Sequence, residues 1–346
     1  MILVGIVGAS GYTGEELIKI LHQHPNAELR ALTSSKNANE KVKDVLNLDF
    51  PYEGTFCSPD IENLDGCDLV FFATPNGVAM SMAEKLVERN IRVIDISADY
   101  RIKDIELWEK WYGQKHLSPQ LVDQSVYGLP EMHGQREKIA SSMIVGNPGC
   151  YPTAVLTALL PVIKLGQVSC DDLIIDAKSG VTGAGRSLKE TNLFSEISEG
   201  LAPYGIAHHR HAPEIEQEIG FAAGSDNVTI NFTPHLVPMN RGELVTIYAK
   251  TNGAKADDVR ASLNAFYDDK PFVRIVGADE TPATRHVRGS NYCHVGVYDD
   301  RLPNRVILVA TLDNLVKGSS GQAIQNMNLM CGFEETSGLT QLPLYP

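Results

Sequence analysis

The chain has 346 residues, of which 43% are hydrophobic and 21% are charged, and this balance is typical of a globular protein long enough for two domains. Its net charge of -13 argues against nucleic-acid binding and against a membrane-surface role. No apolar run approaches the ~20 residues of a membrane helix, and Met1 leads into a strand without the basic start of a secretion signal. The six cysteines form no CxxC pair, so neither a metal site nor a disulfide framework is expected, and a reducing cytoplasm is the simplest compartment.

The first half of the chain predicts alternating strands and helices. Residues 2–7 form a continuous apolar run, as in a strand buried on both faces of a parallel sheet. Thr13 and Glu16 have the spacing of a capping box at the start of the first helix. The alternation predicts an α/β domain with helices on both faces of the sheet. Further strands are expected at 29–33, 69–73 and 93–96, and helices at 15–21 and 78–88.

A glycine-rich turn connects the first strand to the first helix. Gly8, Gly11 and Gly14 are spaced G-x-x-G-x-x-G, and glycines here let the backbone approach a pyrophosphate at a helix N-terminus. The second strand ends in Ser34, Ser35 and Lys36, where an NAD-specific site usually carries an acidic residue. Hydroxyls and a lysine can accept a 2′-phosphate, so NADP is favoured over NAD.

Arg101 follows the strand at 93–96. Ligands of open α/β sheets bind at the carboxyl ends of strands, so Arg101 is a candidate for binding a substrate anion. The alternative is a surface ion pair with Asp99 or Asp104.

Cys150 lies between a Pro-Gly turn and an apolar run that predicts a helix over 155–165. Pro152 suits the first turn of such a helix, and the positive end of the helix dipole favours a thiolate at Cys150. Cys150 is therefore a candidate nucleophile, with a small, inert, buried cysteine as the alternative.

The second half of the chain predicts a different architecture. Strands are expected at 173–177, 228–233, 244–250, 294–298 and 306–312, with one clear helix among the later ones at 257–267 and a final helix over 314–330. This pattern predicts an α+β domain with a mostly antiparallel sheet, and a domain boundary at the turn beside Cys150.

Two loops of this half carry candidate site residues. His209 and His211 are candidates for a general acid–base near a thiolate, and His211 is preferred because Pro213 begins a helix that would hold it. A surface loop is the alternative, and a metal site lacks a third ligand. Arg186 ends the small-residue loop at 179–186 and is suited to binding a phosphate or carboxylate, although a flexible loop is also compatible with this composition.

Together with several other short sequence strings, these loops resemble those of the N-acetyl-gamma-glutamyl-phosphate reductase family, which is related to the aspartate-semialdehyde dehydrogenases. The resemblance extends over nearly the whole chain. The shared strings are Gly8–Gly14, Ser97–Arg101, Tyr127–Glu131, Asn147–Ala154, Ala177–Arg186, His209–Ile215, Phe232–Gly242, Val287–Asn291 and Asp313–Gly318.

The resemblance implies a Rossmann-type NADP-binding domain formed by residues 1–148 and 314–346 and a catalytic and dimerisation domain formed by residues 149–313, in a homodimer or homotetramer. It implies that Cys150 is the acyl-forming nucleophile and that His209 or His211 is the acid–base. The implied NADP contacts are Gly8, Ser10, Gly11, Tyr12, Thr13, Gly14, Ser34, Ser35, Ser179, Gly180 and Asn314. The implied substrate contacts are Arg101, Asn147 and Arg186.

The expected reaction is the NADPH-dependent reduction of N-acetyl-L-glutamyl 5-phosphate to the 5-semialdehyde and phosphate, through a thioester on Cys150. The alternatives are the same chemistry on aspartyl phosphate or on a carrier-linked aminoadipyl phosphate, and an NADP-binding sensor without chemistry.

Overall fold

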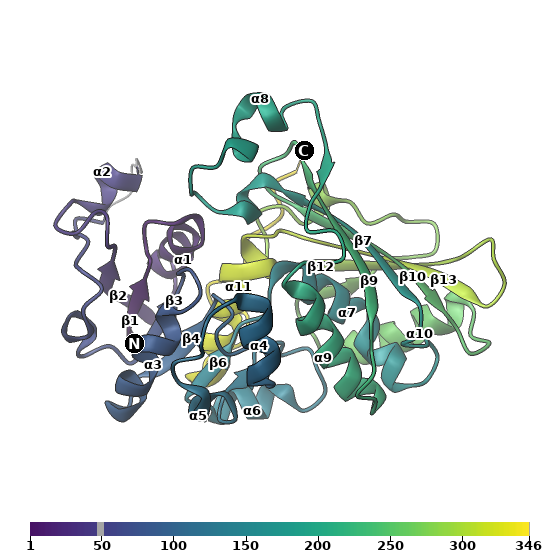
Figure 1. Cartoon of the computed structure of the whole chain (residues 1–346), viewed down its shortest axis with the longest axis horizontal. Helices are drawn as coiled ribbons and strands as arrows, with labels where there is room; N and C mark the ends of the chain where they lie inside the picture. Colours follow the sequence, from purple (N-terminus) through teal and green to yellow (C-terminus); the bar gives the residue numbers. More distant parts are fainter. Residues whose placement is uncertain (47–51, 346) are drawn as a thin grey trace. The chain divides into compact units, whose positions relative to one another are not determined.

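The computed structural model describes residues 1–46 and 52–345 and divides into two compact units (Figure 1). Unit 1 contains Met1–Pro148 and Ser319–Thr340, and unit 2 contains Gly149–Gly318 and the residues from Gln341 on. The sequence assigned all of 314–346 to the first domain, whereas the structure counts 314–318 and the last residues with unit 2.

Unit 1 is built on a six-stranded parallel sheet with the strand order β2-β1-β3-β4-β6-β5. The four residues of β3 are all buried, as expected for a strand inside a parallel sheet. The α/β prediction for this half is thus confirmed. The strands are β1 (Ile2–Val7), β2 (Ala27–Thr33), β3 (Leu69–Phe72), β4 (Arg92–Asp95), β5 (Val126–Tyr127) and β6 (Ile144–Gly146).

The helices of unit 1 pack on this sheet through apolar side chains such as Leu17 and Leu21 of α1, both of which are buried. The capping box predicted at Thr13 and Glu16 is wrong, because α1 begins at Tyr12 with Gly11 as its N-cap residue. The helices are α1 (Tyr12–His22), α2 (Val42–Leu46), η1 (Ile61–Leu64), α3 (Val78–Glu88), α4 (Ile105–Tyr112), α5 (Pro119–Val122), α6 (Gln135–Ser141) and α11 (Gly321–Met330).

Unit 2 contains a seven-stranded sheet with the order β11-β12-β13-β10-β7-β9-β8. The pairs β7–β9 and β11–β12 are parallel and the other pairs are antiparallel, so the sheet is mixed and the prediction of a mostly antiparallel sheet is wrong. A parallel pair needs a crossover connection, and the helix α9 (His211–Ala223) lies between β7 and β9 in the chain. The strands are β7 (Leu173–Gly180), β8 (Ala202–Pro203), β9 (Ile230–Val237), β10 (Glu243–Lys250), β11 (Val273–Ile275), β12 (Cys293–Asp299) and β13 (Arg305–Leu312).

The core of unit 2 lies between this sheet and the helix α7 (Cys150–Lys164). From Tyr151 to Ile163 every residue of α7 is buried, and α7 contacts α9, β10, β13 and the helix α10 (Ala256–Tyr267). Figure 1 shows α7, α9 and α10 together on one face of the long strands, while α8 (Phe194–Ile197) stands away from them. The shorter turns are η2 (Val181–Ala184), η3 (Glu190–Asn192), η4 (Thr284–His286) and the π-helical turn η5 (Val316–Ser320), whose last two residues belong to unit 1.

Within residues 1–46 and 52–345, no helix is both long enough and apolar enough to cross a membrane.

Candidate active site

The glycine loop of unit 1 has a backbone that only glycine permits at two positions. Gly8 has a φ of 84°, and a Cβ placed there would lie 2.4 Å from the carbonyl oxygen of Ala73. A Cβ on Gly14 would lie 2.6 Å from the Cα of Ala9. The N-cap residue of α1 is Gly11, which makes no side-chain capping bond. A tight glycine turn that leads into a helix start with glycine at the N-cap fits a dinucleotide pyrophosphate.

The end of β2 adjoins this loop. The Ser34 side chain is buried, and its Oγ lies 2.9 Å from the Oγ of Ser10. The backbone N–H of Asn37 also donates to Ser34 Oγ, at 3.3 Å. Ser35 and Lys36 are exposed. Ser34 therefore fixes the loop, whereas the side chains of Ser35 and Lys36 face solvent.

Two serines that the sequence did not single out also contact α1. The Oγ of Ser319 lies 3.5 Å from Thr13 Oγ1, and Ser320 Oγ donates to the carbonyl oxygen of Thr13 at 3.0 Å. They directly follow the string that ends at Gly318, but they fell inside a predicted helix, where a serine carries no signal.

Arg101 and Asn147 hold the loops at the carboxyl ends of β4 and β6. Arg101 is buried, its Nε donates to the carbonyl oxygen of Asn147 at 2.6 Å, and its Nη2 donates to that of Ile96 at 2.7 Å. Asn147 is also buried, and its Oδ1 accepts a 2.9 Å hydrogen bond from Asn326. Asp99 accepts hydrogen bonds from backbone N–H groups at the start of α3. The structure thus gives Arg101 and Asn147 structural bonds, and their contact with substrate stays a prediction.

In unit 2, Cys150 is the first residue of α7 and is half-buried. The N-cap residue is Gly149, whose backbone N–H donates to Glu214 Oε1 at 2.9 Å. The turn η5 packs directly on the cysteine, because a Cβ on Gly318 would lie 2.8 Å from the Cβ of Cys150. The helix start favours a thiolate at this position.

His211 is the first residue of α9, and its ring faces the same helix start. A Cβ on Gly149 would lie 2.5 Å from His211 Nε2, so this nitrogen lies against the residue that precedes Cys150. The ring of Tyr151 meets the ring of His211 edge-on, with centroids 5.8 Å apart. His211 is therefore placed to exchange a proton beside Cys150.

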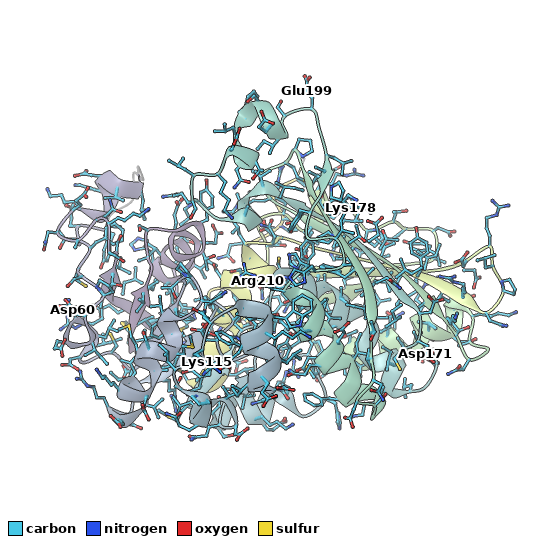
Figure 2. The ribbon with its side chains drawn as sticks, in the orientation of Figure 1. Asp60, Lys115, Asp171, Lys178, Glu199 and Arg210 are labelled. Carbon is cyan, nitrogen blue, oxygen red and sulfur yellow. The ribbon has the colours of Figure 1, made fainter. Side chains whose placement is uncertain are left out.

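His209 has a different environment. Its Nδ1 accepts a 3.1 Å hydrogen bond from the backbone N–H of His211, so this nitrogen carries no proton. Its ring packs edge-on against Tyr204 and Phe232. Burial, with a smaller effect from the charge of Arg210 (labelled in Figure 2), lowers the pKa of His209 to about 4. At neutral pH His209 is uncharged and orients the start of α9.

Two tyrosines complete this aromatic cluster, the buried Tyr151 and the more exposed Tyr204. The hydroxyl of Tyr151 lies 3.1 Å from the hydroxyl of Tyr204, and burial raises the pKa of both phenols. Sequence reasoning missed both tyrosines and Glu214. Tyr151 and Glu214 lie inside strings that it quoted, next to the residues it chose, whereas Tyr204 has no local signal.

Ser179, Gly180 and Asn314 lie together at one end of the unit 2 sheet. The backbone N–H of Gly242 donates to Asn314 Oδ1 at 2.9 Å, and Gly180 N–H donates to the carbonyl oxygen of Gly242 at 2.9 Å. Ser179 Oγ donates to the carbonyl oxygen of Gly180. Arg186 is exposed on the segment after η2. Ser179, Gly180 and Asn314 thus belong to one hydrogen-bonded cluster with Gly242.

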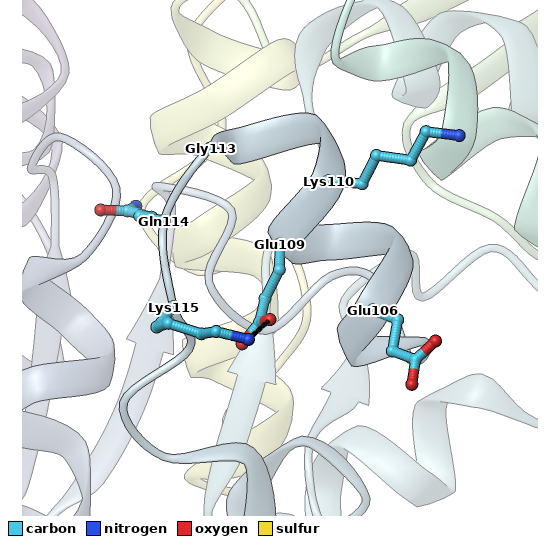
Figure 3. A pocket seen from close by; sticks show the side chains of 6 residues that line it. All are labelled: Glu106, Glu109, Lys110, Gly113, Gln114 and Lys115. Atoms are coloured by element: carbon cyan, nitrogen blue, oxygen red, sulfur yellow. Dashed lines mark hydrogen bonds and ion pairs between the residues drawn. The ribbon is translucent and has the colours of Figure 1, made fainter.

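A surface hollow on unit 1 lies beside α4 and the residues that follow it (Figure 3). Its lining carries charges of both signs, including the ion pair between Lys115 Nζ and Glu109 Oε2 at 2.5 Å. The lining contains no predicted site residue: it consists of Glu106, Glu109, Lys110, Gly113, Gln114 and Lys115. Among the residues that the structure describes, no group of three or more His, Cys, Asp or Glu side chains is arranged to hold a metal ion.

Comparisons with known proteins agree with both units. Residues 3–142 match the family model of the semialdehyde dehydrogenase NAD binding domain, and residues 150–314 match that of the semialdehyde dehydrogenase dimerisation domain. Among solved structures, aspartate semialdehyde dehydrogenase II of Vibrio cholerae complexed with ASA has a TM-score of 0.73 at 17% identity, covering 96% of this chain and 98% of that chain. The aspartate semialdehyde dehydrogenase of Candida albicans with NADP has a TM-score of 0.72 at 19% identity, with the same coverage. These structures show the fold.

Curated relatives are far closer in sequence. The N-acetyl-gamma-glutamyl-phosphate reductases of Geobacter sp. (strain M21) and Laribacter hongkongensis are each 48% identical to this chain, with 100% of both chains covered. The Pseudomonas aeruginosa protein of the same name is 46% identical with the same coverage. The chain therefore belongs to the N-acetyl-gamma-glutamyl-phosphate reductase family of the semialdehyde dehydrogenases.

Proposed function

We propose that this chain reduces N-acetyl-L-glutamyl 5-phosphate to N-acetyl-L-glutamate 5-semialdehyde and phosphate, through a thioester on Cys150. The observation that supports it best is the pairing of Cys150 at a helix start with His211 Nε2 facing Gly149. The names of the relatives supply the acyl phosphate class.

The side chains divide the chemistry as follows. His211 Nε2 takes the thiol proton, and the Cys150 sulfur attacks the acyl carbon, so that a C–S bond forms while the bond to phosphate breaks. The backbone N–H groups at the start of α7 stabilise the oxyanion. On release of the aldehyde the C–S bond breaks, and His211 returns its proton to the sulfur.

NADPH supplies the hydride when it is bound. The glycine loop fits its pyrophosphate because Gly8 and Gly14 admit no side chain. Ser35 and Lys36 are the exposed groups for the 2′-phosphate, and Ser179, Gly180 and Asn314 are proposed for the nicotinamide half. His209, neutral and half-buried among aromatic rings, orients His211.

The test is phosphate-dependent reduction of NADP with N-acetylglutamate semialdehyde. Cys150→Ser should be nearly inactive while its affinity for NADP stays unchanged. His211→Asn should lose about 10²–10⁴-fold in kcat. Substantial turnover by Cys150→Ser would refute the thioester, and a larger loss in His209→Asn than in His211→Asn would reassign the acid–base.

The same assay separates the alternatives. Aspartate semialdehyde as the better substrate would indicate the aspartyl phosphate reaction, and dependence on a carrier protein would indicate the aminoadipyl reaction. An NADP-binding sensor would show no turnover, and Cys150→Ser would leave its function unchanged.

We also propose that two copies associate through unit 2, as the name of the matching dimerisation domain suggests. The sheet face away from α7 is only half-covered and includes Leu244, Tyr248 and Val309, while Phe194 is 81% exposed on α8. Phe194→Asp should shift the protein toward monomer in light scattering, and an unchanged mass would argue against this surface.

We further propose that the protein works in the cytoplasm, because a nucleophilic thiol suits that reducing compartment.

A further inference from the structure

Glu243 is a buried carboxyl group that the reaction described above does not use. It is the first residue of β10, it is 0% exposed, and it pairs with Ser179 of β7 and Leu312 of β13. In the described part of the chain, no donor meets the usual distance and angle limits for a hydrogen bond to either of its carboxyl oxygens. A carboxylate without such partners is strongly disfavoured in a buried site, so this position selects for a group that can hold a proton.

The Cys150 side chain lies beside the start of β10. A Cβ on Gly318 would lie 2.8 Å from Cys150 Cβ and 3.1 Å from Cδ1 of Leu312, which is the residue opposite Glu243 in the sheet. Burial raises the pKa of Glu243 to about 8, hydrogen bonding from the weak S–H donor of Cys150 opposes the rise, and the charge of Asp313 adds to it. Glu243 in turn raises the pKa of Tyr151 and of Tyr204. The sulfur of Cys150 therefore has a titrating carboxyl group beside it.

The neighbouring Asp313 is not the proton carrier. Its Oδ1 accepts from the backbone N–H of Leu315 at 2.8 Å, its Oδ2 accepts from that of Gly289 at 2.6 Å, and Arg241 Nη1 lies 3.7 Å away. Backbone donors and a guanidinium stabilise the charge of Asp313. A charged Asp313 makes a second negative charge at Glu243 unfavourable.

We propose that Glu243 is a second acid–base group on the Cys150 sulfur and shares one proton with the thiol. This rests on the proposed function only in taking Cys150 as the nucleophile. In the step, the S–H bond of Cys150 breaks and an O–H bond forms on Glu243. The thiolate then accepts a hydrogen bond from a neutral acid, and no oxidant or reductant takes part.

The proposal predicts which combination of charges on Cys150 and Glu243 is favoured. Thiolate beside neutral Glu243 is favoured, whereas thiolate beside ionised Glu243 is disfavoured by repulsion. Two groups coupled in this way lose their protons in two steps that belong to the pair. His211 comes from α9 and faces Gly149, so it can act on the sulfur without replacing Glu243.

The test measures the rate of iodoacetamide alkylation of Cys150 against pH, from about pH 6 to about pH 10, by mass spectrometry of its peptide. Wild type, Glu243→Gln and Glu216→Gln are compared, with Cys150→Ser as the blank. Glu216 is a matched control because its pKa is also raised by burial, and its Oε1 accepts from Ile230 N–H at 3.0 Å.

Wild type and Glu216→Gln should show two ionisations. Glu243→Gln should show one, with a midpoint lower by about one pH unit or more, because the neutral amide cannot repel the thiolate. Superimposable profiles of wild type and Glu243→Gln would overturn the proposal. If Glu243→Gln fails to fold, infrared difference spectra of wild type before and after alkylation replace it. A shifted band of a protonated carboxyl group supports the proposal, and an unchanged spectrum refutes it.

Alkylation needs neither substrate nor NADPH. A chain that fails to reduce N-acetylglutamyl phosphate but shows the altered profile in Glu243→Gln would contradict the proposed function and leave the role of Glu243 standing. The reverse result would contradict Glu243 alone.

Discussion

Gly149→Ala tests whether the position of His211 controls the reaction. Gly149 has φ -67° and ψ 161°, a conformation that alanine adopts without strain. The new Cβ would lie 2.5 Å from His211 Nε2, whereas unstrained contacts between such atoms are about 3.5 Å or longer. The imidazole must therefore move by about 1 Å.

A displacement of about 1 Å at a reacting group can lower the rate about 10²-fold. We expect kcat of Gly149→Ala to fall by about that factor, with a stability loss of about 1–3 kcal/mol from the added methyl group. The assay is phosphate-dependent NADP reduction, with chemical denaturation to measure stability. Gly277→Ala is the matched control, because its Cβ would meet only Glu280 Cγ at 3.9 Å and Cδ at 4.0 Å.

The double variant with His211→Asn makes the test specific. If the methyl group acts through the imidazole, Gly149→Ala should change kcat less than about threefold when His211 is already absent. Wild-type activity in Gly149→Ala would refute the assigned geometry. An equal loss with and without His211 would show that the methyl group acts on α7 instead.

Two further predictions concern the cofactor and pH. Ser35→Asp places a carboxylate at an exposed position near the expected 2′-phosphate, and should weaken NADP binding about tenfold or more in a titration while changing NAD binding far less; equal effects would contradict the assignment. Burial lowers the pKa of His294 from 6.5 to about 4, so the unfolded chain binds the extra proton and stability falls as pH decreases from about 6.5 to about 4. This one residue accounts for about 3 kcal/mol of the stability lost over that range. Urea unfolding at about pH 6.5 and at about pH 4 should show this loss in the wild type and not in His294→Gln. An equal pH dependence in the two proteins would refute the prediction.

The sequence predicted the sheet of unit 1 and the helix start at Cys150 because their signals are local. The apolar run of β1, the glycine spacing of the loop and the Pro-Gly turn before Cys150 each depend on a few adjacent residues. The mixed sheet of unit 2 was not predicted. The sequence indicates a helix start at Pro213, but Glu214 and Glu218 are both buried on α9, so the inner face of this helix does not look apolar in the sequence. The full length of α9, and with it the crossover that makes β7 and β9 parallel, was therefore not anticipated.

The histidines show the same limit of local information. His209 and His211 are two residues apart, and their sequence context alone gives both a claim to be the acid–base. Their difference comes from three-dimensional contacts: Nδ1 of His209 accepts from the N–H of His211, while Nε2 of His211 faces Gly149. The lowered pKa of His209 follows from burial, which no spacing rule reports.

Glu243 changes how the helix start at Cys150 should be understood. Next to Cys150 the sequence shows only a helix dipole that favours a thiolate, and such an effect is typically about 0.3–1 kcal/mol. An ionised carboxyl group beside the sulfur opposes the thiolate, and only a neutral one supports it. With burial and Asp313 both raising its pKa, Glu243 can hold the shared proton as a neutral acid beside the thiolate. The nucleophile then depends on a strand residue more than 90 positions away as much as on its own helix.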